Sequence, residues 1–165
     1  MDLEDDNFIR FVVAADDSKL EYILIGGLAL ILNGGIRYTE DADVWMEPTN
    51  ENRDRLMSTL RALDFTEEEL VGLTLADFTQ PQIIRLEDQI DILTRVHIQL
   101  KYDDCRKRAK PFSMPGGQVI YFLHINDLRE AKVLARRTKD LNDILMIDEL
   151  IDELKKQGGS ETNQS

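Results

Sequence analysis

The feature that most constrains the fold is the stretch from Tyr22 to Glu47, in which short apolar runs alternate with glycines and lead to two aspartates. One apolar run ends at the pair Gly26-Gly27, and a second follows at once. Short apolar runs bounded by glycine predict a buried strand followed by a short helix. The glycine pair would then lie at the strand-to-helix turn, where free main-chain N–H groups attract anions such as phosphate.

Two carboxylates follow on the next predicted strand. Asp41 and Asp43 lie two residues apart in a segment that continues with the apolar residues Val44 to Met46. On a strand, side chains two residues apart point to the same face, about 6–7 Å from each other. Such carboxylates repel each other unless a cation lies between them, and Mg²⁺ prefers hard oxygen ligands. An anion-binding turn followed by a metal-binding carboxylate pair predicts chemistry on a nucleoside triphosphate.

These motifs carry a family resemblance. Gly26-Gly27 followed by Asp41-Ala42-Asp43-Val44 resembles the signature of the nucleotidyltransferase superfamily, which has the polymerase-beta-like fold. The segment from Arg37 to Asp43, Arg-x-Thr-x-Asp-x-Asp, is similar to the small bacterial enzymes of toxin–antitoxin and abortive-infection systems. Such proteins have a third carboxylate on a later strand, which Asp91 matches. One departure is Gly27, where many relatives have serine, so phosphate contact there would come from main-chain N–H groups alone.

The resemblance continues into the last third of the chain and covers about residues 22–143. Toxin-like nucleotidyltransferases have a late lysine and then Arg-x-Lys-Asp-x-x-Asp, matched here by Lys132, Arg137, Lys139, Asp140 and Asp143. The resemblance implies that Lys132 reaches the triphosphate and that Asp140 orients the triphosphate or another residue of the site.

The residues and the resemblance together imply a metal-dependent nucleotidyltransferase, which moves NMP from an NTP to an acceptor hydroxyl and releases pyrophosphate. The catalytic and metal-binding residues would be Asp41, Asp43 and Asp91, which would hold two Mg²⁺ ions, with Mn²⁺ as a substitute. Asp91 would also accept the proton of the acceptor. The residues that bind or orient the nucleotide would be Gly26, Gly27, Arg37, Lys132 and Asp140.

Several alternatives stay open at this point. The acceptor is a partner protein such as a cognate antitoxin or a kinase, a tRNA 3′ end, or a small antibiotic-like molecule. A rival hypothesis is a non-catalytic protein that keeps the nucleotidyltransferase fold for binding a partner. Retention of all three carboxylates counts against that hypothesis. A third interpretation is a plain acidic α/β domain in which the motifs arise by chance.

Composition narrows the class of protein. The 165 residues, 42% of them hydrophobic, suit one domain, predicted over residues 1–157 with a disordered tail at 158–165. No apolar run is long enough for a membrane span, the acidic N-terminus is unlike a signal peptide, and the single cysteine, Cys105, suits the cytoplasm. The net charge of −12 argues against binding of long duplex nucleic acid.

The periodicities predict an α/β (α+β) fold, with a small mixed sheet flanked by helices and a helical C-terminal part from about residue 124. The hairpin that carries Asp91 should lie beside the strand of Asp41 and Asp43, with Arg85 pointing into the same cleft. Trp45 should pack in the core. Strands are predicted over 22–25, 41–47, 83–86, 89–96 and 118–122, with a loop over 111–117. Helices are predicted over 5–20, from 49, from 66, over 99–109, over 128–137 and from 138, and Asn126-Asp127 is expected to cap the helix over 128–137.

Overall fold

The computed structural model describes residues 1–86 and 89–160. Helices and strands follow one another along this part of the chain. In order they are α1 (Asp6–Asp17), β1 (Tyr22–Ile25), α2 (Gly26–Leu32), β2 (Ala42–Met46), α3 (Asn50–Ala62), α4 (Glu67–Thr74), β3 (Ile83–Leu86), β4 (Ile90–Leu93), α5 (Tyr102–Arg108), β5 (Lys110–Ser113), β6 (Val119–Phe122), α6 (Ile125–Ala135), the short 3₁₀ helix η1 (Thr138–Asp140) and α7 (Leu141–Ser160).

The strands form one mixed sheet in the order β3-β4-β2-β1-β6-β5. The central strand β2 pairs antiparallel with β1 and parallel with β4, and β1 pairs parallel with β6. The outer strands β3 and β5 each pair antiparallel with their neighbour. The predicted α/β fold, with a small mixed sheet and helices around it, is therefore confirmed.

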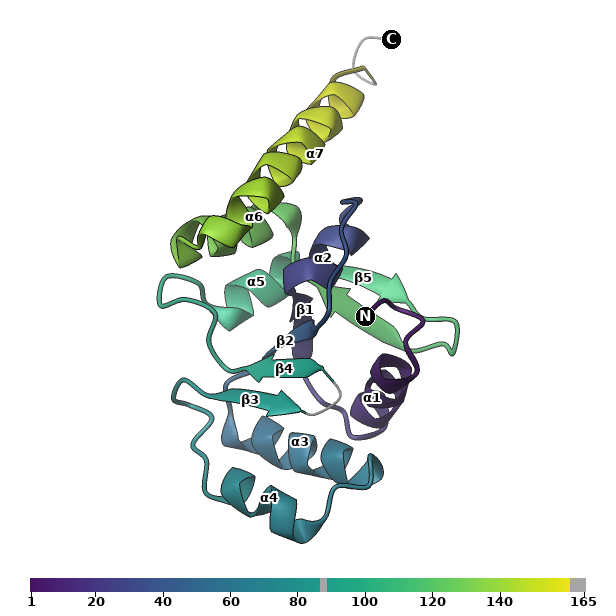
Figure 1. Cartoon of the computed structure of the whole chain (residues 1–165), viewed down its shortest axis with the longest axis vertical. Coiled ribbons are helices and arrows are strands. Elements are labelled where there is room, and N and C mark those ends of the chain that lie inside the picture. The colour runs from purple at the N-terminus through teal and green to yellow at the C-terminus, as the bar shows by residue number, and fades with distance from the viewer. Residues whose placement is uncertain (87–88, 161–165) are drawn as a thin grey trace.

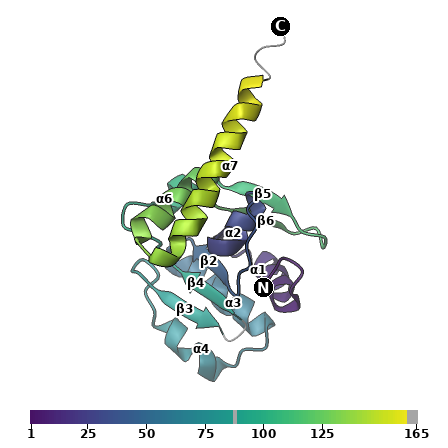
Figure 2. The same ribbon diagram turned by 45° about the horizontal axis from the view of Figure 1, so that its top comes forward.

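Helices pack around the sheet in two groups. Figure 1 shows α3 and α4 below strands β3 and β4, and α6 and α7 above them. In one group α1 packs against α3 and α3 against α4; in the other α2 packs against α6 and α6 against α7. The apolar core lies between these helices and the sheet, and Trp45 is 1% exposed within it, as expected. The second half of α7 extends away from the body (Figures 1 and 2). None of the described helices is both long and apolar enough to cross a membrane.

Polar residues at the helix starts explain where several helices begin. The Asp5 side chain caps α1, and Thr49 caps α3 by accepting a hydrogen bond from a main-chain N–H of the first turn. At α4, Thr66 and Glu69 form a reciprocal capping box. The helices predicted to start at residues 5, 49 and 66 are therefore confirmed.

Two segments differ from the sequence prediction. The predicted loop over 111–117 begins with three residues of β5, because an edge strand tolerates a proline such as Pro111. Helix α6 begins at Ile125 rather than Leu128, because His124 is the cap and its Nδ1 accepts a hydrogen bond from the Asn126 N–H. Asp127, expected to act as a cap, is instead buried and paired with Arg108 at 2.8 Å.

Other boundaries shift by a few residues. The helix predicted over 99–109 forms only over Tyr102–Arg108, and the strand predicted over 89–96 is Ile90–Leu93. Helix α7 continues through Ser160, past Gly158, where the tail was expected to begin. The rest of that predicted tail, residues 161–165, lies outside the described residues.

Candidate active site

The register of three neighbouring strands brings the predicted carboxylates together. Asp43 on β2 lies opposite Asp91 on the parallel strand β4 and opposite Ile25 on β1. Residues in register on adjacent strands point to the same face of the sheet, so the two carboxylates share a face. Asp41 directly precedes β2. The hairpin of Asp91 therefore lies beside the strand of Asp43, as the sequence predicts.

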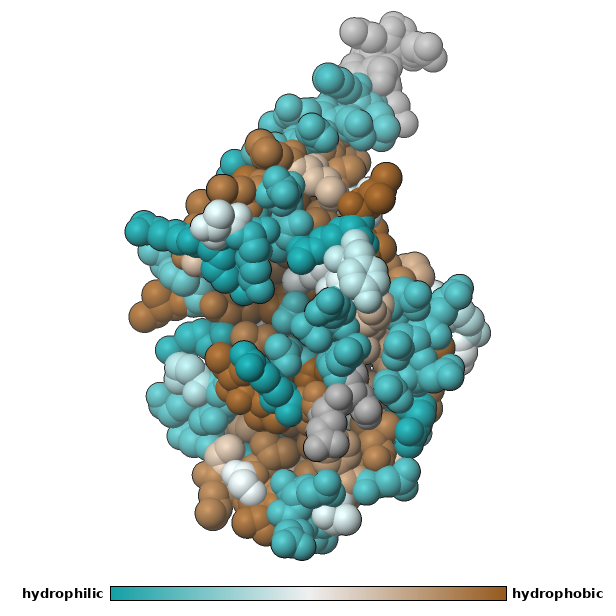
Figure 3. Space-filling view, in the orientation of Figure 1, coloured by the Kyte–Doolittle hydropathy of each residue, from teal (hydrophilic) through white to brown (hydrophobic). Residues whose placement is uncertain are grey.

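These carboxylates line a cavity of about 540 Å³, which also contacts the β1–α2 turn and α6. Its volume is within the range of sites for small molecules. All eight residues that the sequence predicts for the site line it, namely Gly26, Gly27, Arg37, Asp41, Asp43, Asp91, Lys132 and Asp140. Arg85 lines it as well, with its Nε 3.9 Å from an oxygen of Asp91. Hydrophilic side chains cover the middle of this face of the molecule, between α7 and the strands β3 and β4 (Figure 3).

The carboxylates act on one another electrostatically. Burial raises the pKa of Asp43 above its ordinary value, and repulsion from Asp91 and then Asp41 raises this pKa further. Arg137 and Lys132 act in the opposite direction and lower the pKa of Asp43. Asp43 is thus an acidic group close to two other acids and two cations, which is typical of sites that handle charged ligands.

The donor set suits a hard divalent cation, because carboxylate oxygens are the ligands that Mg²⁺ prefers and because the three acids repel one another without one. Within residues 1–86 and 89–160, no three His, Cys, Asp or Glu side chains are grouped closely enough to hold a metal ion together. The two-metal site therefore stays a prediction, which the chemistry of Asp41, Asp43 and Asp91 fits.

Both glycines of the turn allow a close approach that a side chain would prevent. Gly26 has φ +63°, in the left-handed region, and a Cβ there would overlap the carboxylate of Asp43. A Cβ at Gly27 would lie 2.6 Å from Oγ1 of Thr39, whose hydroxyl donates to the carbonyl oxygen of Asp41 at 3.0 Å. Thr39 therefore fills the space that a serine at position 27 would need, which explains the departure noted in the sequence.

Gly26→Ala is expected to lower the free energy of unfolding by about 1–3 kcal/mol, because it combines an unfavourable φ with overlap at Asp43. Gly72→Ala is the matched control: Gly72 lies in α4, and a Cβ there would have no atom within 4 Å, so alanine should raise helix stability by up to about 1 kcal/mol. Urea unfolding of both variants checks this. Equal stability of the two variants would contradict the close approach at Gly26.

A buried ion-pair network forms a further part of the cavity wall. Lys132 on α6 is 5% exposed, and its Nζ donates to Asp143 at 2.7 Å and to Asp140 at 3.2 Å. A buried ammonium is stable only when it is paired in this way. Lys132 therefore places a positive charge at the cavity from a mostly apolar face of α6. Its two carboxylate partners fix the orientation of the ammonium.

Two arginines complete this network. Arg37, from the segment between α2 and β2, donates to Asp143, and Arg137 donates to Asp140 through Nε at 2.6 Å. Burial raises the pKa of Asp140, but hydrogen bonds from Arg137 and Lys132 outweigh that effect and the pKa is lowered overall. Three cations thus share two carboxylates, which leaves a surplus positive charge beside the cavity.

The charge of the cavity differs from that of the whole chain. The chain has 20 Lys and Arg residues against 32 Asp and Glu residues. Among the described residues that line the cavity, cations and acids are equal in number: Arg37, Arg85, Lys132, Arg137 and Lys139 against Glu40, Asp41, Asp43, Asp91 and Asp140. This concentration of cations in an acidic protein favours an anionic ligand.

Sequence reasoning gave no role to several residues that the structure places in or behind the cavity. Asp143 holds Arg37 and Lys132 together, and the only signal for it was the Asp-x-x-Asp spacing with Asp140. Thr39 packs directly against Gly27, a contact that nothing in the sequence indicates. Tyr38 also lines the cavity and is 76% exposed.

The fold and this cavity together define a nucleotidyltransferase-like protein. A comparison with family models agrees: the chain belongs to the family described as Nucleotidyltransferase of unknown function (DUF6036), whose model matches residues 4–156. No curated protein matches the chain. The superfamily inferred from the two motifs is therefore confirmed, whereas the resemblance to toxin–antitoxin and abortive-infection enzymes stays a prediction.

Proposed function

We propose that this protein transfers NMP from an NTP to an acceptor hydroxyl in a metal-dependent reaction. The observation that carries the proposal is the meeting, in one cavity, of the carboxylates of β2 and β4, the glycine turn and the buried cation of α6. In the reaction, the acceptor oxygen bonds to the α-phosphorus and the bond from that phosphorus to the bridging oxygen of the β-phosphate breaks. Pyrophosphate leaves, and the acceptor gives up its proton.

The chain's own residues have separate tasks in this scheme. The main-chain N–H groups at Gly26 and Gly27 point to the phosphates, since the first N–H groups of α2 have no partner within the helix. Lys132 neutralises phosphate charge, and Asp140 and Asp143 hold its ammonium in place. Asp91 accepts the proton from the acceptor hydroxyl. Most of the rate enhancement then comes from positioning and charge stabilisation.

Asp41, Asp43 and Asp91 would hold two Mg²⁺ ions, which would neutralise the triphosphate and lower the pKa of the acceptor hydroxyl. With both ions bound, the balanced charges of the cavity lining would become net positive. A fully ionised NTP carries about four negative charges, so the loaded site and the substrate would match in charge.

The acceptor and the biological setting belong to the proposal as well. A protein acceptor, a tRNA 3′ end and a small molecule all present a hydroxyl, and the resemblance at residues 37–43 supports a toxin–antitoxin setting with a cognate antitoxin as partner. The net charge of −12 favours an acceptor other than long duplex nucleic acid.

The test is incubation of the purified protein with each α-labelled NTP and Mg²⁺ or Mn²⁺, alone and with cell extract. The control is the Asp41→Asn/Asp43→Asn variant, checked for folding by circular dichroism. We expect transfer of label by the wild type only, and the size of the labelled species identifies the acceptor class. Metal-dependent NTP binding without transfer under any condition would favour the non-catalytic binding protein. Absence of both binding and transfer would contradict the proposal.

A further inference from the structure

Residues 36–39, in the segment between α2 and β2, alternate between exposed side chains and side chains that are half-buried or buried. Arg37 and Thr39 point inward: Arg37 donates to Asp143 on α7, and Thr39 is buried against Gly27. Ile36 and Tyr38 are 90% and 76% exposed. The residues before and after Tyr38 are therefore anchored, Arg37 by its ion pair with Asp143 and Thr39 by its contact with Gly27, and these contacts fix the backbone that carries Tyr38.

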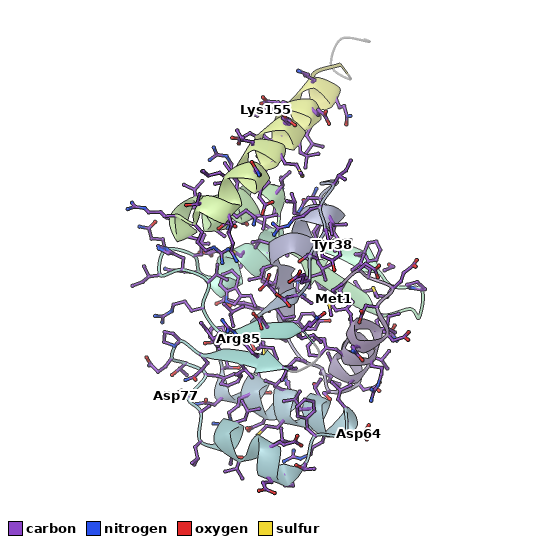
Figure 4. The ribbon with its side chains drawn as sticks, in the orientation of Figure 1. Met1, Tyr38, Asp64, Asp77, Arg85 and Lys155 are labelled. Carbon is purple, nitrogen blue, oxygen red and sulfur yellow. The ribbon has the colours of Figure 1, made fainter. Side chains whose placement is uncertain are left out.

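Tyr38 is an exposed aromatic side chain that lines the cavity. Its side chain makes no hydrogen bond, ion pair or ring contact with any residue in the part of the chain that the structure describes. It lines the same cavity as Gly27 and Asp43, and it is the one aromatic residue among the described residues of the lining. In Figure 4 Tyr38 lies beside α2, and Arg85, which also lines the cavity, lies on the β3–β4 hairpin. Single exposed hydrophobic side chains are common on protein surfaces, but Tyr38 differs from residues such as Leu75 and Ile98 because it lines the cavity of the three carboxylates.

We propose that Tyr38 is a stacking platform for a nucleobase, an inference that rests on the proposed function. Every base has a flat π-face, and stacking on an aromatic side chain contributes to affinity whatever the base is. Tyr38 is adjacent in sequence to Thr39, which packs on the phosphate-binding glycine turn. A nucleotide with its phosphates at Gly26 and Gly27 would therefore occupy a cavity whose lining includes Tyr38. The base belongs either to the donor NTP or to the 3′ end of a nucleic-acid acceptor.

The experiment separates base contacts from phosphate contacts. Binding to wild type, Tyr38→Phe and Tyr38→Ala is measured by calorimetry in Mg²⁺ with three probes: the four NTPs, inorganic tripolyphosphate, and a short single-stranded RNA. We expect Tyr38→Ala to weaken NTP binding on the order of tenfold or more and to leave the Kd of tripolyphosphate unchanged. Tyr38→Phe keeps the ring and should bind within about twofold of wild type. Loss confined to the RNA would assign the base to the acceptor.

Each other outcome overturns the inference. If Tyr38→Ala binds NTP and RNA like the wild type, the base contacts other groups, such as the aliphatic residues Leu93, Val96 and Leu128 of the lining. If Tyr38→Ala weakens tripolyphosphate and NTP equally, Tyr38 supports the backbone rather than a base. Wild-type protein that binds tripolyphosphate as tightly as NTP contradicts only the role of Tyr38. Wild-type protein that binds neither contradicts the proposed function itself.

Discussion

Asp43→Asn is expected to make the metal-free protein more stable and to remove its response to Mg²⁺. Asp43 is partly buried beside two other carboxylates. Burial first, and then repulsion from Asp91 and Asp41, raise the pKa of Asp43, so its ionised side chain is held at a cost in stability. Removing that charge should raise the free energy of unfolding by about 0.5–2 kcal/mol, the range found when unfavourable surface charges are replaced. The melting temperature should then rise by about 2–5 °C. A gain in stability with a loss of function is typical of residues kept for a site.

Thermal unfolding in EDTA and in millimolar Mg²⁺ measures both effects. The wild type should melt higher in Mg²⁺, because a ligand that binds only the folded state stabilises it, and Asp43→Asn should melt at the same temperature in both buffers. Asp152→Asn is the matched control, since Asp152 is an exposed acid on α7 and should change neither value by more than about 1 °C. Lower stability of Asp43→Asn in EDTA would show that the carboxylates do not repel one another as inferred.

Lys132→Met is expected to be the most destabilising single change in the cavity wall. It keeps most of the buried aliphatic stem but removes the ammonium that pairs with Asp140 and Asp143. Loss of the ammonium removes its hydrogen bonds to two buried carboxylates, at a cost of about 3 kcal/mol. This is the low end of the range for a broken buried pair, because Arg37 and Arg137 still neutralise the two carboxylates. For a chain of this length the melting temperature should fall by about 10 °C.

A double-mutant cycle distinguishes a paired charge from simple packing. Lys132→Met, Asp143→Asn and the double variant are compared by urea unfolding, and the double variant should be less destabilised than the sum of the two single changes by about 1–3 kcal/mol. Lys155→Met, on the exposed part of α7, is the control and should be near neutral. Additive effects of the two single changes would contradict the network around Lys132.

Much of the site could be predicted from the sequence because its residues follow local rules. A strand, a glycine turn and a helix are visible in the apolar runs around Gly26, and the alternation over residues 41–44 predicts Asp41 and Asp43 close together, of which Asp43 lies on β2 and Asp41 directly before it. Asp91 could be found because an acid inside a short apolar run is costly unless it has a task. Predictions failed where a local pattern was ambiguous. Asn126-Asp127 resembles a helix cap, but a tertiary contact with Arg108 decides the place of Asp127.

The sequence by itself determined the family, the strand-to-helix turn and the carboxylates, since periodicity, glycine and acid placement act within a few residues of the chain. Only the tertiary structure decided how Arg37, Lys132 and Arg137 share two carboxylates, why position 27 has no room for a side chain, and that Tyr38 lines the cavity. These features join residues up to about a hundred positions apart, such as Arg37 and Asp143. Burial, charge pairing and steric fit at such separations depend on packing, which no local pattern encodes.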